Sequence, residues 1–437
     1  MSEKNNYPKI LVISSNCFST QKNNGKTVAS YFSNYPGDRL AQLYIWSEYP
    51  DSMLCQNYYR ITDMDMLKSW IGKNNECGQK VNIRETQEDN NISRVYGKRY
   101  THWHSMRVAR EFIWLRGSWK TENFTNWLEN FSPDVILFSG IGNPSLFRIA
   151  DFICKEYNIP IIVSIGDDYY LPRISLSPFY HIRRLWLVHW MKKILHTNRS
   201  ELLTINKYMR ETYKEFFKKD SLIMMNFVDA PEVCPEYSDS KSPLRIAYIG
   251  SLTHNRWKAL EFLADVLSCS KYKNDYTIEV YVRDIPDNKV LKAISKPPYI
   301  KYCGSLDAQG VIKMQKEADI LLLAESFDYI CRKNTFLSLS TKITEYMSMG
   351  KPLLAIGPPE IGSMRFLKDN SQAVCITKLD KKETINAFEI LVDSTFRKKT
   401  GEYNWNSIYG MMTINNNSDI VIRLATKLYK ESSRDEI

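Results

Sequence analysis

Short apolar runs rich in β-branched residues recur along the chain, separated by polar loops and by stretches with helical spacing of apolar residues. Such runs are typical of buried strands in a parallel sheet. In the first half they are KILVIS (9–14), SPDVILFSG (132–140) and IPIIVSIGDD (159–168), and the helical pattern PSLFRIADFICKEY (144–157) separates the last two. Residues 50–130 are polar and turn-rich, and show helical apolar spacing only near their end.

A second series follows residues 230–243, whose prolines, serines and acidic residues are typical of a domain linker. Its predicted strands are RIAYIGSL (245–252), YTIEVYVRD (276–284), YIKYCGSL (299–306), ADILLLAES (318–326), KPLLAIGPP (351–359) and AVCITK (373–378). The predicted helices between them include ALEFLADVL (259–267), AQGVIKMQKEA (308–318) and TKITEYMSMG (341–350).

Strands that alternate with helices predict an α/β fold with two Rossmann-like, doubly wound parallel-sheet domains. We expect an N-terminal domain over residues 1–229, a linker over 230–243 and a second domain over 244–400. Residues 401–437 should form a helical tail that could pack back across the cleft. Loops at the carboxyl ends of parallel strands bind ligands, so the two domains are expected to face a central ligand cleft.

Composition narrows the class of protein only slightly. The 437 residues include 59 Lys+Arg and 49 Asp+Glu, a net charge of +10 that permits a nucleotide, nucleic acid or lipid surface as partner. Nine scattered cysteines without a Cys-x-x-Cys pair argue against zinc ribbons and thioredoxin-type motifs, and indicate reduced thiols. No apolar run reaches the roughly 20 residues of a spanning helix, and the start lacks signal-peptide features. We therefore expect a cytoplasmic protein.

The segment SLSTKITEYMSMGKP (338–352) is the most informative motif. Ser340 or Thr341 can cap a helix that Gly350 ends, and free N–H groups at such a helix start attract an anion. Lys342 adds a charge in the first turn and shares a face with Glu345. A lysine on a diphosphate and a glutamate on ribose hydroxyls would together hold a nucleotide. A capped surface helix with an i,i+3 ion pair explains the same spacing, and both interpretations stay open.

The stretch from residue 319 to 358 resembles the donor-binding half of GT-B glycosyltransferases, especially glycosyltransferase family 4, in which a strand with an acidic end precedes an "(S/T)-K-x-x-E-Y-x-x-x-G-x-P" helix. KILVISS…NNGKT, SPDVILFSG, IPIIVSIGDDY, MNFVD and RIAYIGSLTHNRWKALEFL resemble other parts of that fold in the same order. The resemblance covers most of the chain except residues 50–110 and the C-terminal tail.

The resemblance implies a role for each matching residue. Gly25 and Gly250 would contact the nucleotide or its phosphates, and either Arg256 or Lys258 would lie near the diphosphate. At the helix start, Lys342 would bind the phosphates together with Ser340 and Thr341. Glu345 would bind the ribose, Glu325 would lie near the donor sugar, and Gly304 would border the base. Fixed cations stabilise the charge that develops on a departing diphosphate, so no metal is implied. The sequence departs from the family pattern at Ser251, at Leu337, at Gly166-Asp167 in place of His-Asp, and at Asn24-Gly25 in place of two glycines.

Asp167 and Asp168 follow an apolar strand directly. A carboxylate there could act as a general base or bind a sugar hydroxyl, and it could equally be a loop acid or a cap.

Two other motifs resemble known nucleotide or metal sites only in part. KNNGKT (22–27) ends like a P-loop, but Thr20 occupies the position of the first glycine of that motif, which argues against a Walker NTPase. Asp63-Met64-Asp65 matches the metal-binding motif of GT-A enzymes, although a helix start with acids in its first turn explains it better.

Residues 181–219 carry ten Lys/Arg and three Glu. We predict that this basic stretch forms a long helical segment. Tryptophans and basic residues on one helix suit the surface of an anionic inner membrane, and a helix that packs its tryptophans into the core is the alternative. No nucleic-acid motif accompanies the charge. His102 and His104 belong to no recognisable metal-ligand set.

The resemblance implies a retaining, metal-independent glycosyltransferase of the hexosyltransferase type, as in surface-polysaccharide assembly. It would need no cofactor and would move a sugar from a UDP- or GDP-linked donor to a hydroxyl of a glycan or lipid-linked acceptor. A sugar-nucleotide epimerase of the UDP-N-acetylglucosamine 2-epimerase kind shares the architecture and is the first alternative. A catalytically silent nucleotide-sugar-binding or membrane scaffold protein is the second.

Overall fold

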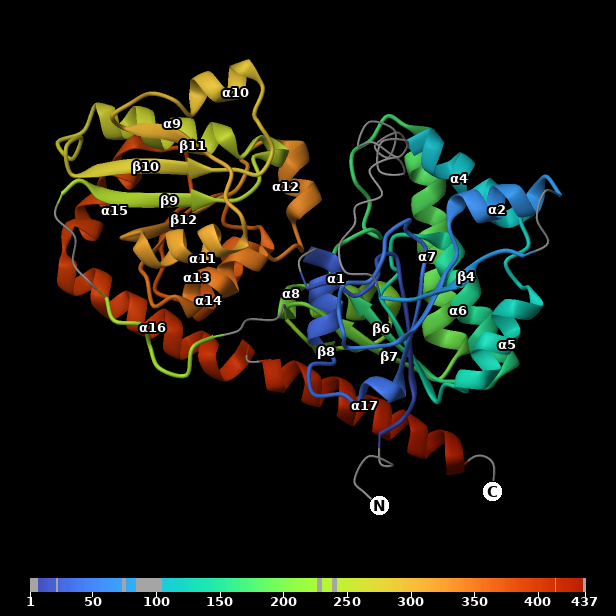
Figure 1. The fold of residues 1–437 in the computed structure, drawn as a ribbon. Helices are drawn as coiled ribbons and strands as arrows, with labels where there is room; N and C mark the ends of the chain where they lie inside the picture. Colours follow the sequence, from blue (N-terminus) through green and yellow to red (C-terminus); the bar gives the residue numbers. More distant parts are fainter. Residues whose placement is uncertain are drawn as a thin grey trace. The chain divides into compact units, whose positions relative to one another are not determined.

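The computed structural model describes residues 7–20, 23–72, 76–83, 104–225, 230–237, 242–412 and 414–434. The chain divides into two compact units. Unit 1 comprises Met1–Met225 together with Ile414–Ile437, and unit 2 comprises Asn226–Thr413. Each unit has one sheet with helices on both faces (Figure 1).

The sheet of unit 1 has eight strands in the order β4-β3-β2-β1-β5-β6-β7-β8, all parallel except β4, which is antiparallel to β3. Leaving out the edge strands β4 and β8, this is the Rossmann order, in which successive strands are added first on one side of β1 and then on the other. In chain order the strands are β1 (Ile10–Ser14), β2 (Leu40–Tyr44), β3 (Asn57–Arg60), β4 (Gln79–Val81), β5 (Val135–Phe138), β6 (Ile161–Ile165), β7 (Ser200–Thr204) and β8 (Leu222–Ile223).

Helices cover both faces of this sheet, since its central strands are buried throughout. On one face Val28 of α1 and Val421 and Leu424 of α17 share a core with Ile10 and Val12. Helices α5, α6 and α7 pack on the sheet as well. The helices of unit 1 are α1 (Asn23–Ser30), η2 (Gly37–Arg39), α2 (Asp63–Trp70), α4 (His104–Arg116), α5 (Glu122–Phe131), α6 (Pro144–Glu156), α7 (Pro178–Thr197), α8 (Lys207–Phe217) and α17 (Ile414–Arg434).

The sheet of unit 2 has six parallel strands in the order β11-β10-β9-β12-β13-β14, which repeats the Rossmann order. The chain reverses its direction of winding between β9 and β12, so the loops after these two strands diverge from a common point. The strands are β9 (Leu244–Ile249), β10 (Tyr276–Tyr281), β11 (Ile300–Gly304), β12 (Ile320–Ala324), β13 (Leu353–Ile356) and β14 (Val374–Ile376).

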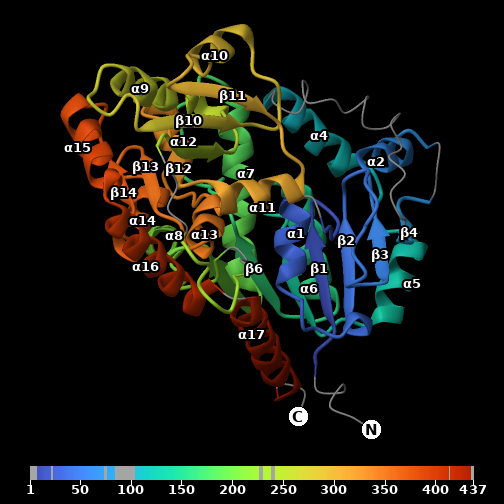
Figure 2. The ribbon, with the colours of Figure 1, turned by 60° about the vertical axis from the view of Figure 1, so that its left-hand side comes forward.

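Helices α9 and α15 share one core with the sheet of unit 2, while α11 and α13 contact β9 and β12 (Figure 2). Helix α16 packs along α13, where the carbonyl oxygen of Gly350 lies 2.2 Å from the site of a Cβ on Gly401. The helices are η3 (Thr253–Asn255), α9 (Trp257–Ser268), α10 (Asn288–Ala293), α11 (Ala308–Glu317), α12 (Tyr329–Thr335), α13 (Thr341–Ser348), α14 (Gly362–Asn370), α15 (Lys381–Val392) and α16 (Ser394–Met412).

The structure confirms the two doubly wound parallel sheets and every strand predicted from an apolar run. It corrects two details. The basic stretch 181–219 is not continuously helical, because β7, with buried Leu202 and Leu203, separates α7 from α8. The predicted boundary between residues 400 and 401 falls inside α16, and the tail is divided, with α16 in unit 2 and α17 in unit 1. No helix in the described ranges is long and apolar enough to cross a membrane.

Candidate functional site

Several residues of the predicted site in unit 2 follow the carboxyl ends of strands β9 and β12. Gly250 and Ser251 follow β9, and Glu325 follows β12, so these residues flank the point where the winding of the sheet reverses. Ligands of doubly wound sheets bind at such points because the diverging loops leave a crevice there. The sequence prediction had placed Gly250 and Glu325 at strand ends, and the structure brings the two ends together.

An ion pair joins the two loops. Nε and Nη2 of Arg256 lie 3.0 and 2.9 Å from Oε2 of Glu325, whose side chain is only 3% exposed. Burial lowers the pKa of the Arg256 guanidinium, but the neighbouring Glu325 carboxylate outweighs it and the net shift is upward. Arg256 is therefore held as a cation at the reversal point, with part of its side chain still accessible.

Lys258 pairs with a different carboxylate from the one that Arg256 contacts. Its Nζ lies 2.7 Å from Oδ2 of Asp328, and Asn255 donates to the same oxygen at 2.6 Å. The hydrogen bond from Lys258 is the largest cause of a lowered Asp328 pKa. Of the two alternatives for a phosphate-binding cation, Arg256 pairs with the strand-end glutamate and Lys258 with an acid on the adjoining loop.

Helix α13 begins and ends where the motif predicts, but the Ser340 side chain makes no capping hydrogen bond. Ser340 is the N-cap, Thr341 begins the helix, and Gly350 follows it at φ +64°. Lys342 Nζ lies 2.7 Å from Oε2 of Glu345, so the i,i+3 ion pair exists, and both side chains are partly exposed.

Two neighbours fix the position of this helix. Gln315 donates to the same Glu345 oxygen at 3.3 Å. The buried Tyr346 hydroxyl donates to the carbonyl oxygen of Ile249 at 3.0 Å, which ties the helix to the end of β9. The sequence pattern alone gives no role to Tyr346, although the Glu-Tyr pair is part of the motif.

The glycines of the predicted site fall into three groups. A Cβ on Gly25 would lie 2.4 Å from the carbonyl oxygen of Cys17, so this glycine lets the first helix pack on the loop after β1. Gly304 has φ +87° at the end of β11, and Gly250 has only ordinary contacts. Gly357 was missed: its Cβ would lie 2.8 Å from Cβ of Glu325, so it leaves the room that the buried glutamate occupies.

Asp168 in unit 1 has the structural role that was the alternative to catalysis. Its Oδ1 accepts hydrogen bonds from the backbone N–H groups of Tyr170 and Leu171 and from the hydroxyl of Tyr213 at 2.6 Å, and the residue is 2% exposed. A carboxylate with these partners orders the loop after β6. Asp167 beside it is exposed, and stays a candidate for contact with a substrate.

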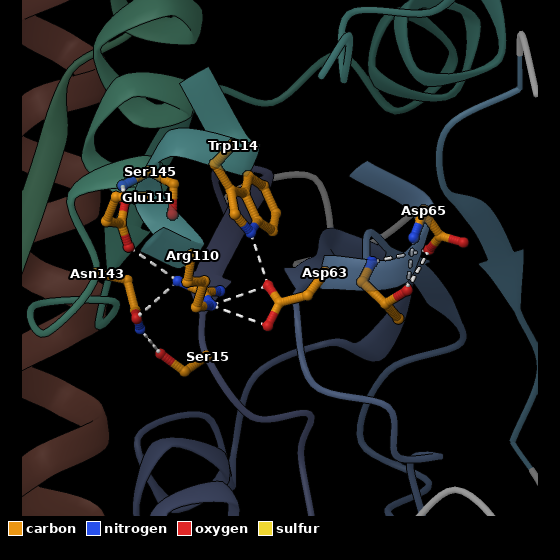
Figure 3. Close-up of polar contacts among 9 residues, drawn as sticks. Ser15, Asp63, Asp65, Arg110, Glu111, Trp114, Asn143 and Ser145 are labelled. Atoms are coloured by element: carbon orange, nitrogen blue, oxygen red, sulfur yellow. Dashed lines mark hydrogen bonds and ion pairs between the residues drawn. The ribbon is translucent and has the colours of Figure 1, made fainter. Parts of the chain in front are cut away.

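Asp63 and Asp65 begin α2, as predicted. Thr62 and Asp65 form a reciprocal capping box, and Asp63 instead faces α4 (Figure 3). Nε of Arg110 lies 2.8 Å from Oδ1 of Asp63, and Nε1 of Trp114 donates to that oxygen at 2.6 Å. No group of three His, Cys, Asp or Glu residues placed to hold a metal ion occurs in the described part of the chain.

The same arginine connects α2 to the carboxyl edge of the sheet. Its Nη1 lies 2.9 Å from Oε1 of Glu111 and 3.3 Å from Oδ1 of Asn143, and Asn143 donates to Ser15 Oγ at 2.7 Å (Figure 3). Ser15 follows β1 and Asn143 follows β5, the strands at which the sheet of unit 1 reverses its winding. This network was not predicted.

The fold is similar to that of solved glycosyltransferase structures. HepE from Anabaena, in complex with UDP and glucose, shares 12% identity over 96% of this chain and 99% of that chain, with a TM-score of 0.56. A glycosyltransferase from Rickettsia africae shares 12% over 97% and 99%, with a TM-score of 0.59. The G117R mutant of S. aureus TarM, in complex with Fondaparinux, alpha-GlcNAc-glycerol and UDP, shares 10% identity over 96% of this chain and 99% of that chain, with a TM-score of 0.57. At these identities the likeness shows the GT-B fold. No family model and no curated protein sequence matches the chain.

Proposed function

We propose that this protein is a GT-B glycosyltransferase that moves a sugar from a UDP- or GDP-linked donor to a hydroxyl of a glycan or lipid-linked acceptor. One observation carries the proposal: Tyr346 ties the helix bearing Lys342 and Glu345 to the end of β9, beside the loop that leads to Arg256. UDP is also present in the HepE and TarM structures of the same fold.

In this proposal unit 2 binds the donor. Lys342 exchanges its contact with Glu345 for a diphosphate oxygen, and the freed carboxylate accepts hydrogen bonds from the ribose hydroxyls. Backbone N–H groups at Ser340 and Thr341 add the partial positive charge of a helix start. Arg256 adds a second cation near the diphosphate. Gly250 lies beside the phosphates and Gly304 beside the base.

Loss of the nucleotide builds negative charge on the diphosphate, and fixed cations lower the barrier because they are already in position. Glu325 acts on this reaction by holding Arg256, which its 2.9 Å ion pair indicates. We propose retention of anomeric configuration, with the leaving phosphate taking the acceptor proton, because Oδ1 of Asp168 is engaged by loop and tyrosine donors. No metal takes part in this scheme.

A thermal-shift screen of UDP- and GDP-sugars tests donor binding, since a ligand of the folded state raises the melting temperature by mass action. Lys342→Ala should weaken binding of the best donor at least about tenfold, a loss of roughly 1.4 kcal/mol. Lys313→Ala, which removes an exposed lysine of the same unit, is the matched control. Donor affinity unchanged in Lys342→Ala contradicts the proposal.

Transfer is then separated from the two alternatives by product analysis. The donor is incubated with and without an acceptor panel, and both nucleotide and sugar products are measured. Acceptor-dependent release of nucleotide supports the transferase. Isomerisation of the intact sugar nucleotide without acceptor indicates an epimerase, and binding without either reaction indicates a silent binding protein.

A peripheral position on the cytoplasmic face of a membrane is a further part of the proposal. Exposed apolar residues gather before and on the first turns of α7: Ile174, Leu176 and Leu185 are 53%, 103% and 57% exposed. The buried face of α7 consists of Leu187, Met191, Ile194 and Leu195, so it does not include the tryptophans. Apolar side chains next to basic ones suit an anionic lipid surface.

Co-sedimentation with vesicles containing phosphatidylglycerol tests this membrane contact. Leu176→Glu combined with Leu185→Glu should reduce the pelleted fraction several-fold. Val233→Glu, at a residue of unit 2 that is 78% exposed, should leave it unchanged. Equal pelleting of all three proteins contradicts the assigned surface.

A further inference from the structure

Asn143 is the N-cap residue of helix α6, but its side chain makes no capping hydrogen bond. Asparagine is among the preferred N-cap residues because its side-chain oxygen can accept from a backbone N–H of the first turn. Here the backbone N–H of Ser145 donates instead to Oε2 of Glu111, a buried residue of α4, at 2.9 Å. Glu111 therefore supplies the capping contact, and the Asn143 amide makes a different one.

Two contacts fix the direction in which the Asn143 amide points (Figure 3). Nη1 of Arg110 donates to Oδ1 of Asn143 at 3.3 Å, and Nδ2 of Asn143 donates to Oγ of Ser15 at 2.7 Å. A guanidinium group has donors only, so the amide oxygen must face Arg110 and the amide nitrogen must face Ser15. Ion pairs with Asp63 and Glu111, at 2.8 and 2.9 Å, hold Arg110 itself in place.

Ser15 is thereby left with a hydroxyl proton that it can donate. Its Oγ accepts from Asn143, so one lone pair and the proton remain for other partners. Among the residues that the structure describes, none accepts that proton. The Ser15 side chain is partly exposed, so its hydroxyl is accessible from solvent.

The backbone around Ser15 is held by the neighbouring strand β2. The carbonyl oxygen of Ser15 accepts from the N–H groups of Ile45 and Trp46, at 3.3 and 3.1 Å, in the loop after β2. The buried Gln42 of β2 donates to the carbonyl oxygen of Asn16 at 3.1 Å. A hydrogen-bond donor on a fixed backbone suits ligand binding, because less conformational entropy is lost when the ligand binds.

We propose that the Ser15 hydroxyl binds a hydroxyl group of the acceptor glycan, and that Asn143 and Arg110 are positioning residues that keep the Ser15 proton available. The inference rests on the proposed function, because unit 2 binds the donor there and the acceptor is assigned to unit 1. Ser15 follows β1 and Asn143 follows β5, where the sheet of unit 1 reverses its winding and where ligands of doubly wound sheets bind. A sugar hydroxyl both accepts and donates, which matches the proton and the lone pair left on Ser15.

Ligand-observed NMR titration of the full chain, saturated with UDP, tests the contact. The probes are the methyl glycosides of glucose, galactose, mannose and N-acetylglucosamine. At least one should bind, and Ser15→Ala should weaken its binding about tenfold, because one hydrogen bond is lost. Ser15→Thr should retain much of the affinity, because it keeps the hydroxyl. Ser33→Ala, at an exposed serine of the same unit, is the control and should change nothing.

Asn143→Asp tests the positioning role. An aspartate keeps the shape of the side chain and can pair with Arg110, but its carboxylate would accept the Ser15 proton that the ligand needs. This variant should weaken sugar binding as much as Ser15→Ala does, while the affinity for UDP stays unchanged. In the Ser15→Ala background the same change should cost no further affinity, whereas a merely structural role would add a second loss. Asn123→Asp, at an exposed residue of α5, is the control.

The outcomes separate this inference from the proposed function. If UDP stabilises the protein and no glycoside binds, or if folded Ser15→Ala binds sugar as the wild type does, the contact is overturned and the donor proposal stands. If a glycoside binds through Ser15 while no nucleotide binds, the contact stands and the donor proposal falls. A loss of UDP affinity in Ser15→Ala overturns the assignment to the acceptor, and additive losses in the double variant overturn the positioning role of Asn143. If Asn143→Asp does not fold, Ser15→Ala and Ser15→Thr decide.

Discussion

The hydroxyl of Tyr346 donates to the carbonyl oxygen of Ile249 at 3.0 Å and accepts from its N–H at 3.3 Å, across 97 residues of sequence. Both backbone groups are at the last residue of β9, where the strand ladder ends. One side chain thus satisfies a strand terminus and sets the position of α13, which carries the candidate nucleotide contacts.

Tyr346→Phe should lower the free energy of unfolding by about 1 to 3 kcal/mol, because it leaves buried polar groups of Ile249 unpaired. Donor affinity should fall as well, since Lys342 lies on the same helix. Urea denaturation and donor titration measure the two effects. Tyr403→Phe, at an exposed tyrosine, is the control and should match the wild type. A stable Tyr346→Phe variant would show that the contact is dispensable.

The Arg256–Glu325 pair should behave as a coupled unit. Glu325→Gln leaves a buried guanidinium without its counter-charge, and we expect a loss of about 2 kcal/mol in the free energy of unfolding. Arg256→Gln combined with Glu325→Gln should lose less than the sum of the two single changes. A double-mutant cycle by urea denaturation measures the coupling, and additive losses would contradict the pair's importance.

Two glycines of α16 should respond in opposite directions to the same substitution. A Cβ on Gly401 would lie 2.2 Å from the carbonyl oxygen of Gly350, so Gly401→Ala should force α16 away from α13 and cost about 2 kcal/mol. A Cβ on the exposed Gly410 meets nothing within 4 Å. Gly410→Ala should therefore add about 0.5 to 1 kcal/mol of helix stability. Thermal denaturation of both variants measures the difference, and equal shifts would show that the close contact is absent.

Asp151 of α6 should contribute stability that depends on pH. Burial raises its pKa, but hydrogen bonds from Lys193, at 2.9 Å, and Lys155 outweigh this, and the net shift is below the ordinary value of 3.8. A depressed pKa means that the contribution is complete above pH 3.8 and is lost as the pH falls through the folded-state value. Asp151→Asn should cost about 1 kcal/mol at pH 7.

The measurement is the free energy of unfolding in urea for wild type and Asp151→Asn between pH 7 and pH 3. The difference between the two curves should shrink toward the acid end, because protonation of the wild-type carboxylate begins there. A difference that stays constant across that range would assign the loss to packing instead of charge.

Local pattern predicted the parts of the fold that are uniformly apolar. Strand β12, ILLLA, and helix α13 with its cap at Ser340 could be predicted because one short stretch holds the whole signal. Strand β2 was missed because Gln42 interrupts its apolar run, although that amide is buried and accepts from the N–H of Phe18 at 2.8 Å. Strand β7 was not predicted as a strand because it lies inside the basic stretch 181–219, which was predicted to be helical.

The candidate site could be predicted residue by residue but not in its contacts. The family resemblance drew attention to Arg256, Glu325 and Lys342, yet no spacing rule connects Arg256 with Glu325, which are 69 positions apart. The same is true of Arg110 and Asp63, separated by 47 positions and joined only by the packing of α2 on α4. Such pairs depend on tertiary structure, and no local periodicity records them.

The position of helix α17 in the core of unit 1 affects when that core can be completed during synthesis. Its Val421, Leu424, Ala425 and Leu428 are buried in the same core as Ile10 and Val28, although unit 2 is encoded between them (Figure 1). On the ribosome that apolar face of the first sheet stays uncovered until residues 414–434 have been synthesised. A nascent chain that stalls before residue 414 would therefore expose a hydrophobic surface to chaperones and proteases, whereas unit 2 is complete at that point.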